Sequence, residues 1–246
     1  MNTIRPAGPG IPLSRELAGV FARMSGLLLS EETVETSLTL LSSLAHETVP
    51  GSCGAGVSVI EGGRRTSAGS TDDRVRDADG LQYELDEGPC LAATAQRELV
   101  VVDDLRAERR WPRWTAAVAP LGLHAALSAP LVAGDTTVGA IKVYADHPGA
   151  FDTRSRELLV MFSAQAALLV ANVQSAERAM RLSEAMRQAV RDRDLVGIAK
   201  GVLIGRHGID EEAALRMLVA RSQHDGILLA GAARAVVDSA VRRRRP

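Results

Sequence analysis

The residues best suited to bind a ligand in this sequence are four cations near its C-terminus. They are Lys200, Arg206, Arg216 and Arg221. Ser222 and Gln223 follow the last of them. Lysine and arginine supply most of the sequence-independent affinity of proteins for nucleic-acid phosphates, and Ser and Gln can hydrogen bond to unpaired bases. The same cations can equally face water or form salt bridges with nearby carboxylates, which are Glu211, Glu212 and Asp225.

A helix must position the first of these cations. Apolar residues recur over Leu195–Ile204 at the spacing of an amphipathic helix with one buried stripe. Lys200 falls outside that stripe, so its charge should face water or a partner. Gly201 follows it in mid-helix, where glycine costs about 0.8–1 kcal/mol relative to Ala. We therefore expect something to approach the helix backbone closely at Gly201.

Two further helices are expected behind the first. Gly208 ends the first helix, and Asp210 is a good N-cap for the second. The second helix extends to about Gln223 and is broken by Gly226. A third helix, over about Leu228–Val241, keeps its apolar residues on one face. The segment therefore predicts a unit of three helices.

This segment resembles an ANTAR domain over about residues 185–241. The resemblance rests on the run Ala199–Leu203, on the pair Ser222–Gln223, and on apolar residues at matching spacing, which are Ala214, Leu218, Leu229 and Ala233. The family implies a three-helix module of bacterial antitermination regulators that binds RNA stem-loops as a dimer. The RNA-binding residues that we predict on this basis are Ala199, Lys200, Gly201, Arg206, Arg216, Arg221, Ser222 and Gln223.

The chain departs from the family pattern after the Ser-Gln pair. The family has Asn and basic residues there, whereas this sequence has Gly226–Leu228, followed by Ala230 and Gly231. Part of the polar surface expected to face RNA is missing, which keeps open a second interpretation, a unit for dimerisation or partner docking. A third interpretation is a helical DNA-binding regulator, although the turn chemistry and the Ala-Lys-Gly helix match ANTAR better.

The composition favours a two-domain protein of the cytoplasm. The chain has 246 residues, of which 46% are hydrophobic, so there is ample material for a core. No run of about 18 apolar residues occurs, and no transmembrane helix is expected. Residues 1–12 are rich in Pro and Gly and are expected to be a flexible lead-in rather than a signal peptide. Two cysteines are too few for a disulfide framework.

The net charge of −1 is unevenly distributed. From Ala185 onward, 12 Lys and Arg against 7 Asp and Glu give +5, which leaves −6 for the rest of the chain. A basic C-terminal part behind an acidic body fits a module that binds polyanions. Arg242–Arg245 alone supply +4, however, so the asymmetry also fits a solvated basic tail.

The segment before the three helices has the periodicity of a mixed helix and strand domain. Helices are expected over about 13–29 and 31–48, and residues 70–80 should form a loop or a short helix. Strands are expected at about 55–60, 66–69, 99–102, 124–132 and 137–144. This order predicts an α+β fold, in which one central antiparallel sheet has helices packed on a face.

The same segment, about Leu13–Ala171, resembles a GAF domain of the actinobacterial regulator type. The matching runs, in order, are Glu87–Cys90, Asp103–Leu105, Trp111–Pro112, Ser128–Leu131, Val138–Tyr144 and Phe151–Asp152. The family implies a small-molecule or signal sensor, often dimeric, with no enzymatic step. Its ligands lie between the sheet and the covering loops. The residues expected to line such an effector pocket are Tyr83, Glu84, Cys90, Asp104 and His124.

Catalytic and metal chemistry has little support. The signatures of serine hydrolases, P-loop NTPases, zinc proteases and kinases do not occur in the sequence. The five histidines pair with no other His or Cys at ligand spacing, so no metal site and no cofactor is expected. Cys90 follows Pro89 near a helix start, where a thiolate would be stabilised, but a small buried thiol is the better interpretation.

A long helix is expected to join the two domains. From Thr153 past Ala176, apolar residues alternate spacings of four and three, as in a heptad seam. They are Phe162, Ala166, Leu169, Val173, Ala176 and Met180. Packing on the domain's own sheet accounts for part of this seam, and a homodimer contact is expected nearer Ala176–Val190.

The expected organisation is therefore a flexible N-terminus (1–12), a GAF-like sensor (13–171), a connecting helix (172–190), an ANTAR unit (191–241) and a basic tail (242–246). Together these features predict a cytoplasmic, signal-responsive homodimer without enzymatic activity. It would bind stem-loop RNA and act by transcription antitermination. A small-molecule effector and RNA are the expected partners, and no membrane is.

Overall fold

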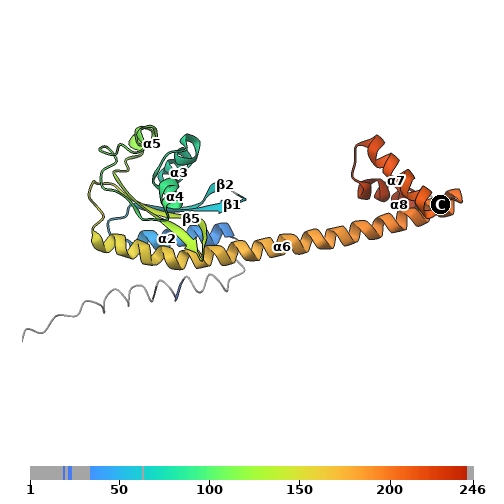
Figure 1. Ribbon diagram of the computed structural model, residues 1–246, viewed down its shortest axis with the longest axis horizontal. Helices are drawn as coiled ribbons and strands as arrows, with labels where there is room; N and C mark the ends of the chain where they lie inside the picture. Colours follow the sequence, from blue (N-terminus) through green and yellow to red (C-terminus); the bar gives the residue numbers. More distant parts are fainter. Residues whose placement is uncertain (1–18, 20–21, 24–33, 63, 243–246) are drawn as a thin grey trace, which may run out of the picture. The chain divides into compact units, whose positions relative to one another are not determined.

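The computed structural model describes residues 34–62 and 64–242, together with Gly19, Ala22 and Arg23. The expected flexible segment 1–12, nearly all of the expected helix 13–29 and residues 243–246 of the basic tail lie outside the described residues. The chain divides into two units between Ser175 and Ala176, and each unit is described by itself (Figure 1).

A five-stranded antiparallel sheet forms the centre of the first unit, in the order β2-β1-β5-β4-β3. The strands are β1 (Gly54–Glu61), β2 (Arg64–Ser70), β3 (Val100–Val102), β4 (Ala125–Ala133) and β5 (Thr136–Ala145). β4 and β5 form a hairpin whose turn contains Gly134 at a φ of 58°, a left-handed conformation that glycine adopts readily. The predicted central antiparallel sheet is confirmed.

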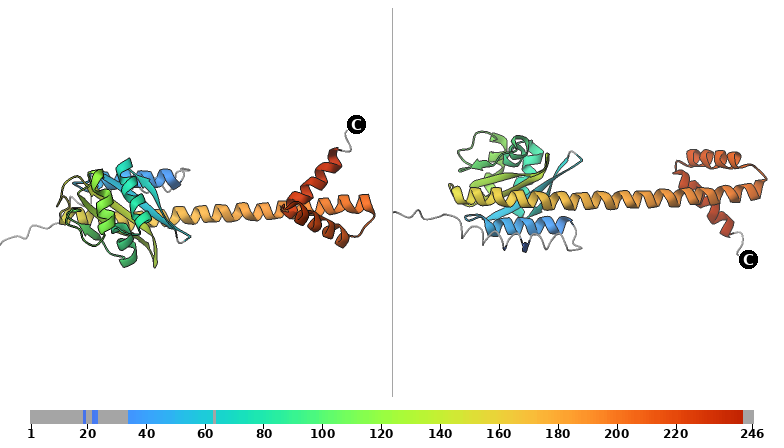
Figure 2. Two further views of the ribbon diagram at one scale, coloured as in Figure 1. Left: turned by 90° about the horizontal axis from the view of Figure 1, so that it is seen from above. Right: turned by 60° about the horizontal axis from the view of Figure 1, so that its bottom comes forward.

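Helices cover both faces of this sheet, whereas the sequence predicted helices on one face. On one side lie α2 (Val34–Thr48) and the start of α6 (Thr153–His207). The helices on the other side are α3 (Asp73–Leu85), α4 (Pro89–Gln96) and α5 (Pro112–Val118), with a 3₁₀ turn, η1 (Ala119–Leu121). Figure 2 shows the sheet between these two layers.

Strand alternation separates the buried side chains into two cores, because successive residues of a strand point to opposite faces. On the α2 and α6 face, Ile141 of β5 shares a core with Leu41 and Phe162. On the opposite face, Tyr144 of the same strand shares a core with the fully buried Trp114 of α5. The Trp114 indole N–H donates to the carbonyl of Ala78 in α3 at 3.0 Å.

Residues 70–80 were predicted to form either a loop or a short helix. Most of them belong to α3, a helix of 13 residues. Asp72 caps it, because its carboxylate accepts a hydrogen bond from the main-chain N–H of Val75 at 3.1 Å. Asp86 ends it in the left-handed conformation, at a φ of 52°. Helix α3 thereby covers the sheet at the place where the effector pocket was expected.

Helix α6 contains a stretch that is apolar and long enough to cross a membrane by composition alone. Half of the residues in that stretch are buried in the protein. They include Leu159, Phe162 and Ala166, which belong to the core on the α2 face of the sheet. Packing on the sheet therefore accounts for the buried half of this stretch, whereas Val160, Met161 and Leu168 are exposed.

The second unit has a three-helix core formed by the end of α6, α7 (Glu211–Asp225) and α8 (Leu229–Arg242). Asp210 caps α7 by accepting a hydrogen bond from Ala213 N–H at 2.7 Å, and Gly226 ends it at a φ of 64°. The shared core consists of Ala199, Leu203, Ala214, Leu218, Ala233 and Val236. The three predicted helices are present, and the first of them is continuous with the connecting helix.

Candidate nucleic-acid interface and effector pocket

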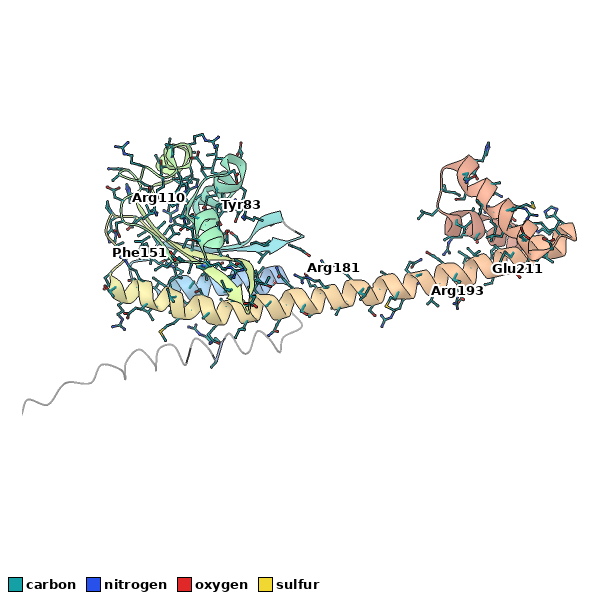
Figure 3. All side chains as sticks on the ribbon, in the orientation of Figure 1. Tyr83, Arg110, Phe151, Arg181, Arg193 and Glu211 are labelled. Carbon is teal, nitrogen blue, oxygen red and sulfur yellow. The ribbon has the colours of Figure 1, made fainter. Side chains whose placement is uncertain are left out.

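Lys200 lies next to the buried Ala199, with its side chain 21% exposed. Its ammonium forms an ion pair with Glu211, the first residue of α7, which is labelled in Figure 3. The hydrogen bond and the charge of Lys200 lower the pKa of the Glu211 carboxyl. Lys200 is thus partly covered and paired, one of the two outcomes that the sequence allowed.

Arg216 and Arg221 are also paired, each with a carboxylate one helical turn away. Arg216 contacts Glu212 at 2.7 Å and Arg221 contacts Asp225 at 3.3 Å. Both pairs are solvent-exposed, and such pairs typically contribute about 0–1 kcal/mol. They can therefore be exchanged for phosphate contacts at little cost.

Arg206 and Arg234 are among the cations of this unit that form no ion pair with a carboxylate in the described part of the chain. Arg206 donates to the hydroxyl of Ser239 on α8 at 2.9 Å. Arg234 is exposed on α8, and no hydrogen bond or ion pair involves its side chain within residues 34–62 and 64–242. Arg234 was not among the predicted RNA contacts, although its place off the apolar stripe of the third helix indicates an exposed cation.

The remaining predicted RNA contacts differ in their surroundings. The Ser222 hydroxyl donates to the carbonyl of Ile227 at 2.6 Å and so stabilises the turn after α7, while Gln223 is exposed. A Cβ atom added to Gly201 would meet no atom within 4 Å. The close approach expected at Gly201 therefore does not come from the described part of this chain, and the helix backbone is open there to a partner.

The turn where the sequence departs from the ANTAR pattern is apolar and exposed. Ile227 is 41% exposed and Leu228 is 82% exposed. Large exposed apolar side chains side by side are typical of a contact surface. The turn therefore offers hydrophobic contacts where the family would offer polar ones.

The five residues of the expected effector pocket lie in different places. Tyr83 and Cys90 line one cavity of about 10 Å³, which holds about one water molecule. Glu84 is exposed on α3. The Asp104 carboxylate accepts from the main-chain N–H of Arg106 at 2.9 Å, and His124 lines a separate groove at the surface. The structure therefore brings together only Tyr83 and Cys90.

A buried ion pair that the sequence analysis missed lies beside this cavity. Lys142 of β5 and Asp79 of α3 are both fully buried and form a salt bridge, and the Lys142 ammonium also donates to the Ser58 hydroxyl at 2.6 Å. Burial alone would lower the pKa of Lys142, but Asp79 raises it above its ordinary value. A charged residue inside the otherwise apolar run Val138–Tyr144 was the available signal.

The two cysteines are poor nucleophiles in this environment. Cys90 is buried, and the Ser128 hydroxyl donates to its sulfur at 3.2 Å. Burial raises the pKa of the Cys90 thiol and also that of Cys53. Because the thiolate is the reactive form, both residues favour an inert thiol at neutral pH.

Comparisons with known proteins match these two units. The profile of the GAF domain matches residues 31–171, and the profile of the ANTAR domain matches residues 184–237. No curated protein matches the chain.

Several solved structures share the fold of the first domain. A GAF sensor protein from Burkholderia vietnamiensis is 21% identical with a TM-score of 0.50, covering 68% of this chain and 98% of that one. The GAF domain of a phosphoenolpyruvate-protein phosphotransferase from Coxiella burnetii is 12% identical with a TM-score of 0.51, covering 67% and 98%.

A free methionine-R-sulfoxide reductase from Neisseria meningitidis, solved with its substrate, is 14% identical with a TM-score of 0.50, covering 72% of this chain and 99% of that one. At these identities the likeness shows the fold alone. The GAF match extends over more than half of the chain and the ANTAR match follows it. The chain therefore belongs to the GAF domain family and carries a C-terminal ANTAR domain, the arrangement of a two-domain regulator.

Proposed function

We propose that this protein is a cytoplasmic, signal-responsive regulator that binds stem-loop RNA and acts by transcription antitermination. The observation that carries the proposal is the ANTAR match over residues 184–237, which spans the three-helix core of the second unit. The GAF match over residues 31–171 supports a sensing role for the first unit. Regulation then requires a signal that favours one arrangement of the protein over another, because a ligand shifts only states that it binds unequally.

The cations of the second unit supply the affinity for RNA. Arg206 and Arg234 can bind a phosphate without breaking an ion pair with a carboxylate. Lys200 must first break its ion pair with Glu211. The open backbone at Gly201 allows a sugar-phosphate backbone to come close. No aromatic residue follows Phe162 in the sequence, so bases would be read by polar side chains such as Gln223 rather than by stacking.

The proposal includes a homodimer formed through α6. Leu182, Met186 and Val190 are each more than half exposed and recur every four residues on this helix. By contrast, Phe162, Ala166 and Leu169 of the expected heptad seam are buried against the sheet of their own domain. We therefore propose that the dimer contact lies after Ala176, on Leu182, Met186 and Val190.

Binding of the full-length protein to a tandem stem-loop RNA across a series of salt concentrations tests the proposal. An RNA of equal length with scrambled loops and a DNA duplex of equal length serve as controls. We expect preference for the tandem stem-loop RNA that persists at physiological salt. Equal binding to all three nucleic acids, lost by physiological salt, would contradict it, because charge alone gives that behaviour.

A second candidate function is docking of a partner protein by the ANTAR unit without RNA binding. The exposed pair Ile227 and Leu228 favours it, as do the ion pairs that already engage Lys200, Arg216 and Arg221. The double variant Ile227→Ser and Leu228→Ser separates the two functions. RNA affinity should be unchanged in this variant if the cations bind RNA, and partner binding should be lost if the apolar turn is the functional surface.

A further inference from the structure

A surface groove of the first unit is separate from the small cavity at Tyr83 and Cys90. It lies between the loop 105–112, helix α5 and His124, and its volume is about 350 Å³. Small-molecule sites typically have volumes of about 300–1,000 Å³, whereas the inner cavity has room for about one water molecule. Of the two spaces, the groove is the one with room for an effector.

Two arginines of the groove carry charges that no carboxylate balances. Arg106 and Arg109 line it and are exposed, and their guanidinium groups make no hydrogen bond or ion pair in the described part of the chain. Their main chains are nevertheless held in place. The N–H of Arg106 donates to Asp104 at 2.9 Å, and the N–H of Arg109 donates to Glu108 at 2.8 Å. Two free guanidinium groups are thus presented on an ordered loop.

The carboxylate that lines the groove, Glu108, is already neutralised. Its side chain is 9% exposed and accepts a hydrogen bond from the Arg110 guanidinium at 2.9 Å, which lowers the pKa of Glu108. Arg110, labelled in Figure 3, also donates to the carbonyl of Val101 at 2.7 Å and lies over the Trp111 ring at 4.4 Å. Arg106 and Arg109 therefore leave the groove with a net positive charge.

His124 adds a hydrogen-bonding group whose capacity is not met. His124 lines the groove, and its Nδ1 atom is buried with no hydrogen-bond partner among the described residues. Its backbone is fixed on both sides, because its N–H donates to Ala145 and its carbonyl accepts from Leu105, both at 2.8 Å. Buried polar atoms usually have a partner. Because Nδ1 has no exposed surface, an occupant of the groove would hydrogen bond to it only after the imidazole turns toward the groove.

The rest of the lining is largely apolar and consists of Leu105, Pro112, Ala116, Ala119 and Leu123, together with Thr115. Guanidinium groups bind carboxylates and phosphates through paired hydrogen bonds, and apolar walls favour a ligand with a hydrophobic body. We propose that the groove binds a small organic anion, a carboxylate or phosphate on an apolar body, as the effector of the GAF domain. The role of this anion as an effector rests on the proposed sensing function, whereas its binding in the groove does not.

RNA is the competing occupant, since two arginines also attract a phosphate backbone. A concave site with apolar walls fits a compact ligand better than an extended polyanion. The two occupants are distinguished by measuring RNA affinity for the same arginine variants without any small anion present.

Calorimetric titration of the full-length protein tests the proposal with two anionic probes, benzoate and phenyl phosphate. Benzyl alcohol and benzylamine have the same apolar body without the negative charge. We expect saturable binding of at least one anion and none of the two controls, and comparison of the two anions separates a carboxylate from a phosphate ligand. The nitrogen chemical shifts of the His124 ring, assigned with His124→Gln, should move with the same saturation curve.

Arg106→Ala and Arg109→Ala should each weaken binding about tenfold or more, since each removes a charged hydrogen bond. Ala116→Phe fills the groove and should abolish binding with both arginines retained. Arg76→Ala, in which the lost arginine pairs with Asp73 outside the groove, should leave binding unchanged.

Three results would overturn the proposal. They are no saturable binding of either anion at millimolar concentration, equal binding of benzyl alcohol, or RNA affinity that falls in the two arginine variants. Failure of the RNA-binding proposal would not affect these titrations, which contain no RNA. The two proposals can therefore fail separately.

Discussion

The ammonium group of Lys142 and the carboxylate of Asp79 form an ion pair inside the GAF domain, with no exposure of either side chain. The pair joins β5 to α3, a helix that carries few apolar residues. Gln82 of the same helix adds a hydrogen bond from its amide to Asp79 at 3.4 Å. The helix that covers the sheet is thus attached by polar contacts as well as by packing.

Removal of one charge from this pair should destabilise the domain strongly. Lys142→Ala leaves Asp79 buried without its counter-ion, which typically costs about 3–5 kcal/mol. Urea denaturation followed by circular dichroism measures the loss. The double variant Lys142→Met with Asp79→Leu should recover most of the stability, because buried ion pairs are often replaceable by apolar residues of similar volume. A loss below about 1 kcal/mol in Lys142→Ala would show that the pair is dispensable.

The two tyrosines of the chain predict its behaviour at alkaline pH. Burial raises the pKa of Tyr83 to about 12 and raises that of Tyr144 well above its ordinary value. Because both pKa values are raised, the stability that the two protonated rings contribute is fully present below the ordinary tyrosine pKa of 10.0. It is lost as pH rises toward 12. Tyrosinate absorbance should therefore appear together with unfolding, as followed by circular dichroism. Ionisation of both rings near pH 10 in a folded protein would contradict their burial.

The close contact between β5 and β1 predicts that replacing Gly139 destabilises the domain. A Cβ atom on Gly139 of β5 would overlap the carbonyl oxygen of Ser58 in β1, and neither backbone can move without separating the two strands. Gly139→Ala should therefore destabilise the domain by about 1–3 kcal/mol. Gly80→Ala, in α3 with open space around it, is the matched control and should stabilise by about 0.5–1 kcal/mol. Urea denaturation of the two variants decides the comparison.

Local sequence signals were sufficient for most of the fold. The strands alternate or carry short apolar runs, and Ala133-Gly134-Asp135 marks the central hairpin. Helix α3 was harder to predict, because its buried face consists of Val75, Ala78, Asp79 and Gln82, in which only two side chains are apolar. Because an ion pair helps to attach this helix, its sequence lacks the regular spacing of apolar residues that predicts an amphipathic helix.

The candidate site depended on contacts between distant segments. The pairs Glu212–Arg216 and Arg221–Asp225 follow from their spacing of four on a helix. The pair Lys200–Glu211 crosses the turn between α6 and α7 and requires the packing of both helices. Tyr83 and His124 were predicted to line one pocket but lie at two separate spaces, because the surface that each side chain reaches depends on the packing of distant segments.

The pair Lys200–Glu211 predicts a gain in RNA affinity when the carboxylate is neutralised. Glu211→Gln removes the competitor of a phosphate for Lys200, and an exposed pair of about 0–1 kcal/mol limits the gain to about fivefold. Lys200→Ala should lower affinity and reduce the salt slope by about one unit. In the double variant, Glu211→Gln should add nothing to Lys200→Ala. A gain of equal size in both backgrounds would mean that Glu211 acts through net charge rather than through Lys200.

The exposed apolar residues of α6 predict how the proposed dimer dissociates. Met186 is 63% exposed and lies between Leu182 and Val190 on one side of the helix, so a symmetric contact would bury it twice. Burial of a Met side chain contributes about 1.5–3 kcal/mol, and Met186→Glu should therefore raise the dimer dissociation constant at least about hundredfold. Sedimentation of the full-length protein over a range of concentrations measures this change. Gln188→Glu adds the same charge to an exposed position on the opposite side of the helix from Met186 and should leave the dimer intact. A Met186→Glu protein that sediments like the unmodified chain would place the dimer contact elsewhere.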